Sequence, residues 1–119
     1  MSDFVLAAAS YEKQKYFLEP KFQTLPESIQ EELQIICVTT AQKLGCTFLM
    51  GFREDGEVYF ETVKREKDIN FDEIGAELEV KEIIRVHKDL IASLKVWFTI
   101  FFTKEGEELK DELLKKGEK

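Results

Sequence analysis

The centre of the chain has the sequence pattern of a β-hairpin, and this feature constrains the fold more than any other. Residues 46–52 and 58–63 are rich in β-branched and aromatic side chains, which favour strands. Between them, Asp55 and Gly56 supply the tolerance of positive φ that a tight reversal requires. Because a lone two-stranded hairpin is only marginally stable in water, we expect it to pack on helices or to pair with a second copy of itself.

A helix is predicted immediately before the hairpin. From Ile29 to Leu44, the residues of one stripe recur at spacings of four and three, which is the pattern of one continuous helical face. Thr24 and Glu27 match a capping box at the start of this helix, and Gly45 is a suitable left-handed end. The strand face that carries Phe48 should meet the helix, because it is the more apolar face of that strand.

A second helical pattern follows the hairpin and covers residues 71–102. As one helix it would be longer than a compact domain of this size is wide. It therefore either breaks, near Glu79-Val80-Lys81, or projects and packs on another subunit. The stretch 96–102 is apolar nearly all the way round and should be covered by protein. We interpret it as a central core helix, with a dimer interface and a third strand as the alternatives.

Length and composition indicate a single α+β domain over residues 1–119. A chain of 119 residues with 44% hydrophobic side chains can bury one core and is too short for two ordinary domains. The expected order is a helix, the β-hairpin, a long helix that is whole or broken, and a C-terminal helix. The C-terminal helix is expected to be amphipathic and peripheral, over residues 104–116. Residues 1–10 and 117–119 are expected to be poorly ordered, and Ser10 can cap a short helix that follows it.

The charge distribution argues against binding to nucleic acid or to an anionic membrane surface. The formal net charge is −7, and the segments 1–52, 53–103 and 104–119 carry −2, −4 and −1. Binding to phosphates requires clustered Lys and Arg side chains, and no segment here is net basic. The N-terminal apolar run is shorter than a secretory signal, and no stretch is long enough to be a membrane span. We therefore expect a cytoplasmic protein.

The two cysteines, Cys37 and Cys46, are too few for a disulfide scaffold or a zinc site. Cys37 falls within the first helical pattern and Cys46 opens the first strand, so both are interpreted as small buried hydrophobes. A disulfide between them is geometrically possible, and nothing requires it. The sequence has no glycine-rich phosphate loop and no nucleophile-elbow serine. We predict no cofactor and no bound metal.

Three residues are candidates for ligand binding: Met50, His87 and Trp97. His87 is the single histidine, and it lies on the apolar stripe of the second helical pattern, with Ile83 and Leu90 at one-turn spacings. A histidine in that setting is more often structural than catalytic. If the chain is an enzyme or a small-molecule binder, we expect its ligand in an apolar pocket near Met50, His87 and Trp97.

A resemblance to a known family rests on short motifs in a fixed order: Leu25-Pro26-Glu27 with Glu31-Glu32-Leu33-Gln34-Ile35-Ile36-Cys37, then Gly56-Glu57-Val58-Tyr59-Phe60-Glu61-Thr62, then Asp72-Glu73-Ile74-Gly75. With their spacing, these motifs resemble a small uncharacterised bacterial family of unknown function, over residues 11–102. They consist of helix-capping, core and turn residues. The resemblance therefore implies a shared fold and transfers no active site.

The sequence as a whole favours a non-enzymatic homodimer that acts through protein contacts, and it does not identify any other protein partner. The hairpin is expected to leave two strand edges open, and residues 96–102 offer more apolar surface than one face needs. The alternative is a small-molecule-binding protein or enzyme that uses the apolar pocket proposed above.

Overall fold

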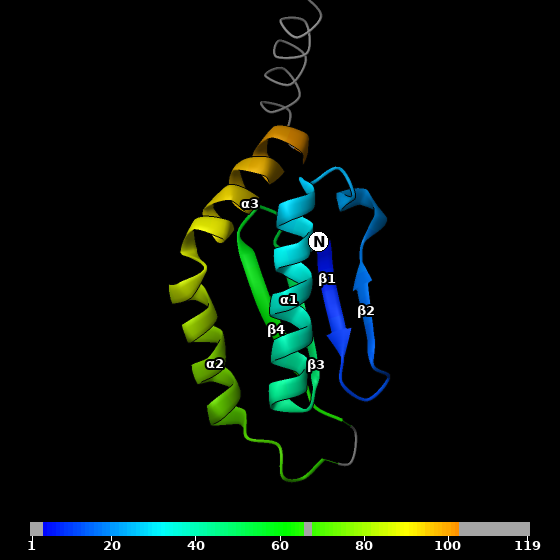
Figure 1. Ribbon diagram of the computed structural model, residues 1–119. Coiled ribbons are helices and arrows are strands. Elements are labelled where there is room, and N and C mark those ends of the chain that lie inside the picture. The colour runs from blue at the N-terminus through cyan, green and yellow to red at the C-terminus, as the bar shows by residue number, and fades with distance from the viewer. Residues whose placement is uncertain (1–3, 66–67, 103–119) are drawn as a thin grey trace, which may run out of the picture.

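A computed structural model describes residues 4–65 and 68–102 as a four-stranded antiparallel sheet with helices on one of its faces (Figure 1). The strand order across the sheet is β2-β1-β3-β4. In chain order the elements are β1 (Phe4–Ser10), β2 (Lys15–Leu18), a 3₁₀ turn η1 (Pro20–Phe22), α1 (Glu27–Leu44), β3 (Thr47–Phe52), β4 (Val58–Val63), α2 (Glu73–Val86) and α3 (Lys88–Phe102). The α+β class predicted from the sequence is confirmed.

The central hairpin is present as predicted. Strands β3 and β4 pair over their whole length, from Thr47 opposite Val63 to the pair next to the turn. Gly56 has φ +91°, a backbone conformation that residues with a Cβ rarely adopt. The Asp55 carboxylate accepts a hydrogen bond from the Glu57 N–H at 3.0 Å and holds the turn closed.

The first segment of the chain differs from the prediction. The expectations of poor order through residue 10 and of a helix after Ser10 are wrong for the described residues, because β1 and β2 form a second hairpin there. Ala7 and Ala9 are buried on the helix side of β1, where their small side chains let α1 lie close to the sheet. Alanine is depleted in strands, so this run gives almost no local strand signal. Gln14 completes the turn with φ +53°.

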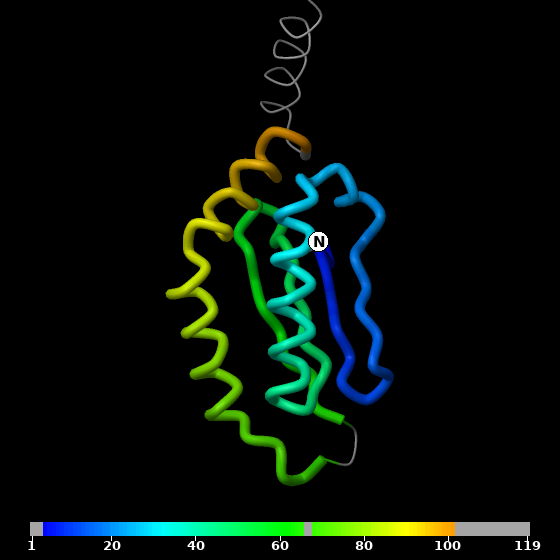
Figure 2. The backbone as a smooth tube through the Cα atoms, viewed as in Figure 1, coloured from blue at the N-terminus to red at the C-terminus, as the bar shows by residue number. Residues whose placement is uncertain are grey.

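Strand β1 also changes which edges of the sheet are open. It lies between β2 and β3 and pairs with both (Figure 2). The expectation that the central hairpin leaves both of its edges open is therefore wrong for β3. In the described part of the chain, the unpaired edges are the outer side of β2 and the outer side of β4.

Helix α1 ends as predicted but begins differently. Gly45 follows it with φ +65° and ψ +39°, a left-handed end. At the start, the residue in the capping position is Pro26 and no side chain caps the helix, so the capping role predicted for Thr24 is wrong. Instead, Gln30 Nε2 donates a hydrogen bond to the Leu25 carbonyl at 2.8 Å, which ties the first turn to the segment before it.

The long helical pattern forms two helices, and the break lies at His87 rather than at the predicted Glu79-Val80-Lys81. His87 has φ −107° and ψ +28°, outside the helical range, although its N–H still donates to the Ile83 carbonyl at 2.8 Å. The chain therefore changes direction with only one residue between the helices.

The apolar stretch 96–102 lies in α3, so the strand alternative for it is wrong. The prediction that this stretch is a core helix is confirmed for Trp97 and Phe98, which are 9% and 3% exposed. Val96 is 59% exposed, so the expectation that the whole stretch is covered is wrong at this position in the single chain. The peripheral helix predicted over 104–116 and the poor order predicted for 117–119 lie outside the described residues.

Aromatic rings from distant segments meet beneath α3. The ring of Phe22 lies 5.5 Å from Phe52 and 5.5 Å from Trp97, measured between centroids. Phe98 continues the cluster, with its centroid 4.9 Å from Phe52 and 5.7 Å from Phe4. Tilted ring pairs at these separations are favourable beyond the apolar area they bury. The cluster fixes α3 against η1 and the adjacent ends of β1 and β3.

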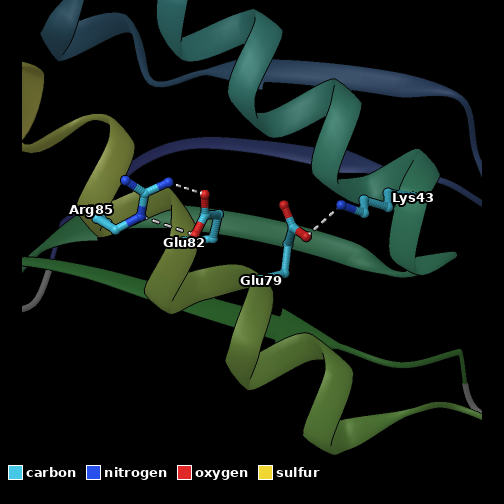
Figure 3. A network of polar contacts seen from close by, with 4 residues as sticks. All are labelled: Lys43, Glu79, Glu82 and Arg85. Atoms are coloured by element: carbon cyan, nitrogen blue, oxygen red, sulfur yellow. Dashed lines mark hydrogen bonds and ion pairs between the residues drawn. The ribbon is translucent and has the colours of Figure 1, made fainter.

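Helices α1 and α2 run side by side over the same face of the sheet (Figures 2 and 3). Lys43 Nζ lies 2.7 Å from Glu79 Oε1 and joins the C-terminal part of α1 to the middle of α2. One turn further along α2, Glu82 and Arg85 pair within the helix, and the hydrogen bond from Arg85 lowers the pKa of Glu82. These ion pairs are exposed or partly exposed, so they orient the helices more than they stabilise them.

The two glycines with positive φ provide a matched test of the turn. Replacing either with Ala strains a left-handed backbone, which costs about 1–2 kcal/mol. At Gly45 the new Cβ meets nothing within 4 Å, whereas at Gly56 it would lie 2.9 Å from a Phe98 ring carbon. We expect Gly56→Ala to lower the free energy of unfolding more than Gly45→Ala, measured by urea denaturation. Equal losses would contradict the contact between the turn and α3.

Candidate protein-interaction site

The structure separates the three ligand-binding candidates. Met50 is fully buried in β3 and Trp97 is buried in α3, and both belong to the hydrophobic core. His87 lies outside that core cluster, with Nδ1 3.6 Å from a carboxylate oxygen of Glu32 on α1. None of the three residues lines the hollows described below. A ligand-binding role for them stays a prediction.

The two faces of the sheet differ in what covers them. In an antiparallel sheet, residues directly opposite each other share a face. The face that carries Phe48 and Met50 lies under the helices, as predicted, and both side chains are fully buried. The opposite face, here called the open face, is covered by no helix of the described part of the chain. It consists of Val5, Ala8, Ser10, Lys15, Phe17, Thr47, Leu49, Gly51, Tyr59, Glu61 and Val63.

The open face is more apolar than the water-facing side of a sheet normally is. Such faces alternate polar residues with the buried ones of the core face. Here Phe17 and Val63 are 49% and 47% exposed, and Leu49 lies between them in the middle of the face. Its two charged side chains, Lys15 and Glu61, lie on the outermost strands β2 and β4. An apolar centre between charged edges is the usual composition of a protein-interaction surface.

Gly51 permits a close contact on the open face. A Cβ at this position would lie 2.6 Å from a Tyr59 ring carbon and 2.4 Å from the Phe4 carbonyl oxygen. The Tyr59 ring therefore lies directly across the glycine, on the neighbouring strand. The Arg53 guanidinium lies 4.9 Å from the centroid of the same ring, which suits a cation–π contact.

A second surface feature is a groove between β4 and α2, here called the edge groove. It consists of two hollows, of about 450 Å³ and about 270 Å³, that share Thr62 and Glu77. The larger hollow lies toward the start of α2, and Phe60 and Val80 form the apolar wall of the smaller one. Together the two hollows are lined by Glu61, Thr62, Val63, Lys64, Phe71, Glu73, Glu77, Phe60, Ala76, Val80 and Lys81.

The cysteines are buried, as predicted, and no disulfide links them. Burial raises the pKa of Cys37 to about 12 and also raises the pKa of Cys46. Tyr16 lies nearby, and its pKa is raised to about 12 by burial and, to a smaller extent, by Cys37. The Tyr16 hydroxyl oxygen is buried and has no hydrogen-bond partner among the residues that the structure describes. All three groups are protonated at neutral pH, so both cysteines remain neutral thiols.

The described residues contain neither a cluster of metal-ligating side chains nor a helix that could cross a membrane. No group of three or more His, Cys, Asp or Glu side chains in this part of the chain is arranged to hold a metal ion. Within the same residues, every helix is too short or too polar to cross a membrane.

Comparison with known proteins identifies the family. The model of a family of unknown function, DUF6145, matches residues 3–106. The chain belongs to this family. The resemblance to an uncharacterised family seen in the sequence is thereby confirmed, and the DUF6145 match extends over β1 to α3. Searches of curated proteins and of solved structures found no match.

Sequence reasoning missed the part of the open face that β2 supplies. Lys15-Tyr16-Phe17-Leu18 is a run with two aromatic residues, followed closely by Pro20, which is a recognisable strand signal. The run is only four residues long and follows a turn without Gly, so a short helix was equally consistent with it. The edge groove had no local signal, because it depends on where α2 lies relative to β4.

The buried thiol of Cys37 predicts a particular dependence of stability on pH. The pKa of this thiol is about 12 in the folded chain, against an ordinary value of 9.0. The contribution of the protonated thiol to the free energy of unfolding is therefore complete below pH 9.0 and is lost as the pH rises toward 12. We expect the wild type to lose more unfolding free energy than Cys37→Ala between about pH 8 and about pH 11, by up to about 1.4 kcal/mol per pH unit. Urea denaturation with reductant present measures it. An equal loss of unfolding free energy in the wild type and in Cys37→Ala would contradict the raised pKa of Cys37.

Proposed function

We propose that this chain is a non-enzymatic cytoplasmic protein that acts as a homodimer, in which the open faces of two copies pack against each other. The observation that carries this proposal is the apolar open face. Leu49 lies at its centre, with Phe17 and Val63 exposed on either side. Exposed apolar patches rimmed by charges are typical of protein–protein interfaces.

A second copy of the same face is a suitable partner for geometric reasons. Sheets commonly pack face to face at about 10 Å with their strands nearly aligned. With a two-fold axis parallel to the strands, β2 of one copy lies opposite β4 of the other. Lys15 then faces the edge strand that carries Glu61 of the partner subunit, so opposite charges meet on both sides of an apolar centre.

The assignment to a non-enzymatic class is supported by how the reactive side chains are used. Cys37 and Cys46 are buried neutral thiols, and Met50 is part of the hydrophobic core. His87 lies at the joint between two helices, beside Glu32. Each of these positions has a structural explanation. The unlinked cysteines support a reducing compartment such as the cytoplasm.

Sedimentation velocity over a concentration series tests the dimer. We expect the wild type to sediment as a dimer that buries at least about 1,000 Å² in total. Leu49→Lys should sediment as a monomer, because it places an unpaired charge in the middle of the interface. Far-UV circular dichroism should show that this variant is still folded.

Ile35→Lys is the matched control for this experiment. Ile35 is a 65% exposed apolar residue of α1, on the helix side of the sheet. The substitution makes the same change of charge and polarity away from the open face, and we expect this variant to remain a dimer. A monomeric wild type at every concentration, or a dimeric Leu49→Lys variant, would exclude the proposed interface.

A further inference from the structure

The outer edge of β4 presents unpaired backbone groups. At the turn, the Arg53 N–H donates to the Glu57 carbonyl at 2.7 Å, so these two residues form a hydrogen-bonded pair. Hydrogen-bonded and non-bonded pairs alternate along antiparallel strands. The N–H and C=O groups of Val58, Phe60 and Thr62 therefore point away from β3. In the described residues, no strand pairs with this edge.

The edge groove provides room beside those backbone groups. Phe60 and Thr62 line its smaller hollow from β4, and Ala76 and Val80 line it from α2. Because both hollows share Thr62 and Glu77, the space is continuous along the strand. A strand edge with a helix alongside is the arrangement that accepts an extended peptide by strand addition.

The side chains on the two sides of β4 define which peptide fits. Successive residues of an added strand point to opposite faces of the sheet. On the helix side they enter the hollows, against the apolar surfaces of Phe60 and Val80. On the other side they lie next to Glu61, in the position of a cross-strand neighbour.

The charges of the groove favour a basic segment. The larger hollow is lined by Glu61, Glu73 and Glu77 and by one cation, Lys64, which lies 3.9 Å from Glu73. Among the described residues, Glu61 and Glu77 have no ion-pair partner. Lys81 adds a positive charge only at the smaller hollow. The net negative charge therefore lies along the C-terminal half of β4.

We propose that an extended segment of a partner protein, with alternating apolar and basic residues, adds to the edge of β4 as a fifth strand. Its apolar side chains fill the edge groove under α2, against Phe60 and Val80, and its basic side chains lie on the opposite face of the sheet, beside Glu61. This site is on the edge of the sheet and shares Glu61 with the proposed dimer interface, whereas the contacts with Phe60 and Val80 in the edge groove do not depend on dimer formation.

Two synthetic peptides test the proposal: a capped seven-residue peptide of alternating Val and Lys, and its counterpart with Glu in place of Lys. Binding to the full chain is followed by nuclear magnetic resonance and calorimetry. We expect the Val–Lys peptide to shift the amide resonances of β4 and α2. The Val–Glu peptide should bind at least about tenfold more weakly, because its Glu side chains then lie beside Glu61.

Charge reversal in the groove provides the matched variant. Glu61→Lys should reverse the preference and favour the Val–Glu peptide. A control with the same change of net charge is Glu31→Lys, at an exposed position on α1, and it should keep the original preference. Either of two results would overturn the proposal: equal binding of both peptides, or shifts confined to the open face. Concentration-dependent shifts of β4 without peptide would also overturn it, because the occupant would then be a second copy.

Discussion

The arrangement of this protein depends on the aromatic cluster that holds α3 against the sheet. Phe22, Phe52, Trp97 and Phe98 come from three segments that are far apart in the sequence, and each ring is almost fully buried. Large aromatic side chains contribute much of the apolar area that a small core can bury. Once these rings are in contact, the position of α3 is fixed. The preceding helix must then connect the far end of β4 to it.

The position of α2 follows from this constraint. The chain leaves β4 at Val63, and it must return along the sheet to reach α3 near the turn of the hairpin. The joint at His87 lets α2 and α3 take different directions, so α2 lies beside α1 over the last strand. All the helices of the described residues thus lie on one face of the sheet. The opposite face and the outer edge of β4 are left for contacts with other chains.

The parts of the fold that were predictable are those that local sequence determines. Asp55-Gly56 identified the hairpin, and Gly45 identified the end of α1, because each supplies a backbone conformation that few residues adopt. Strand β1 was not predictable, because Ala7 and Ala9 have little strand preference of their own and are held by their neighbours on both sides. The break was misplaced for a similar reason, since it depends on where Trp97 finds its partners.

The surfaces were less predictable than the core. Leu49 was assignable to the face opposite Phe48 from strand alternation alone, but the sequence did not show that β1 and β2 would extend the sheet on its other side. Neither charge nor hydrophobicity of the separate segments indicated the edge groove. It results from the distance between two elements whose placement is decided by the aromatic cluster elsewhere in the molecule.

The pairing of β1 with β3 has a consequence for the order of folding. These strands join two hairpins that are separated in the chain by the whole of α1. Each hairpin can close locally, but the sheet is complete only after a long loop has been closed, which is slow. During synthesis, β1 and β2 leave the ribosome long before β3 exists. The inner edge of β1 must therefore stay unpaired for that interval, when it is open to the wrong strands of neighbouring nascent chains.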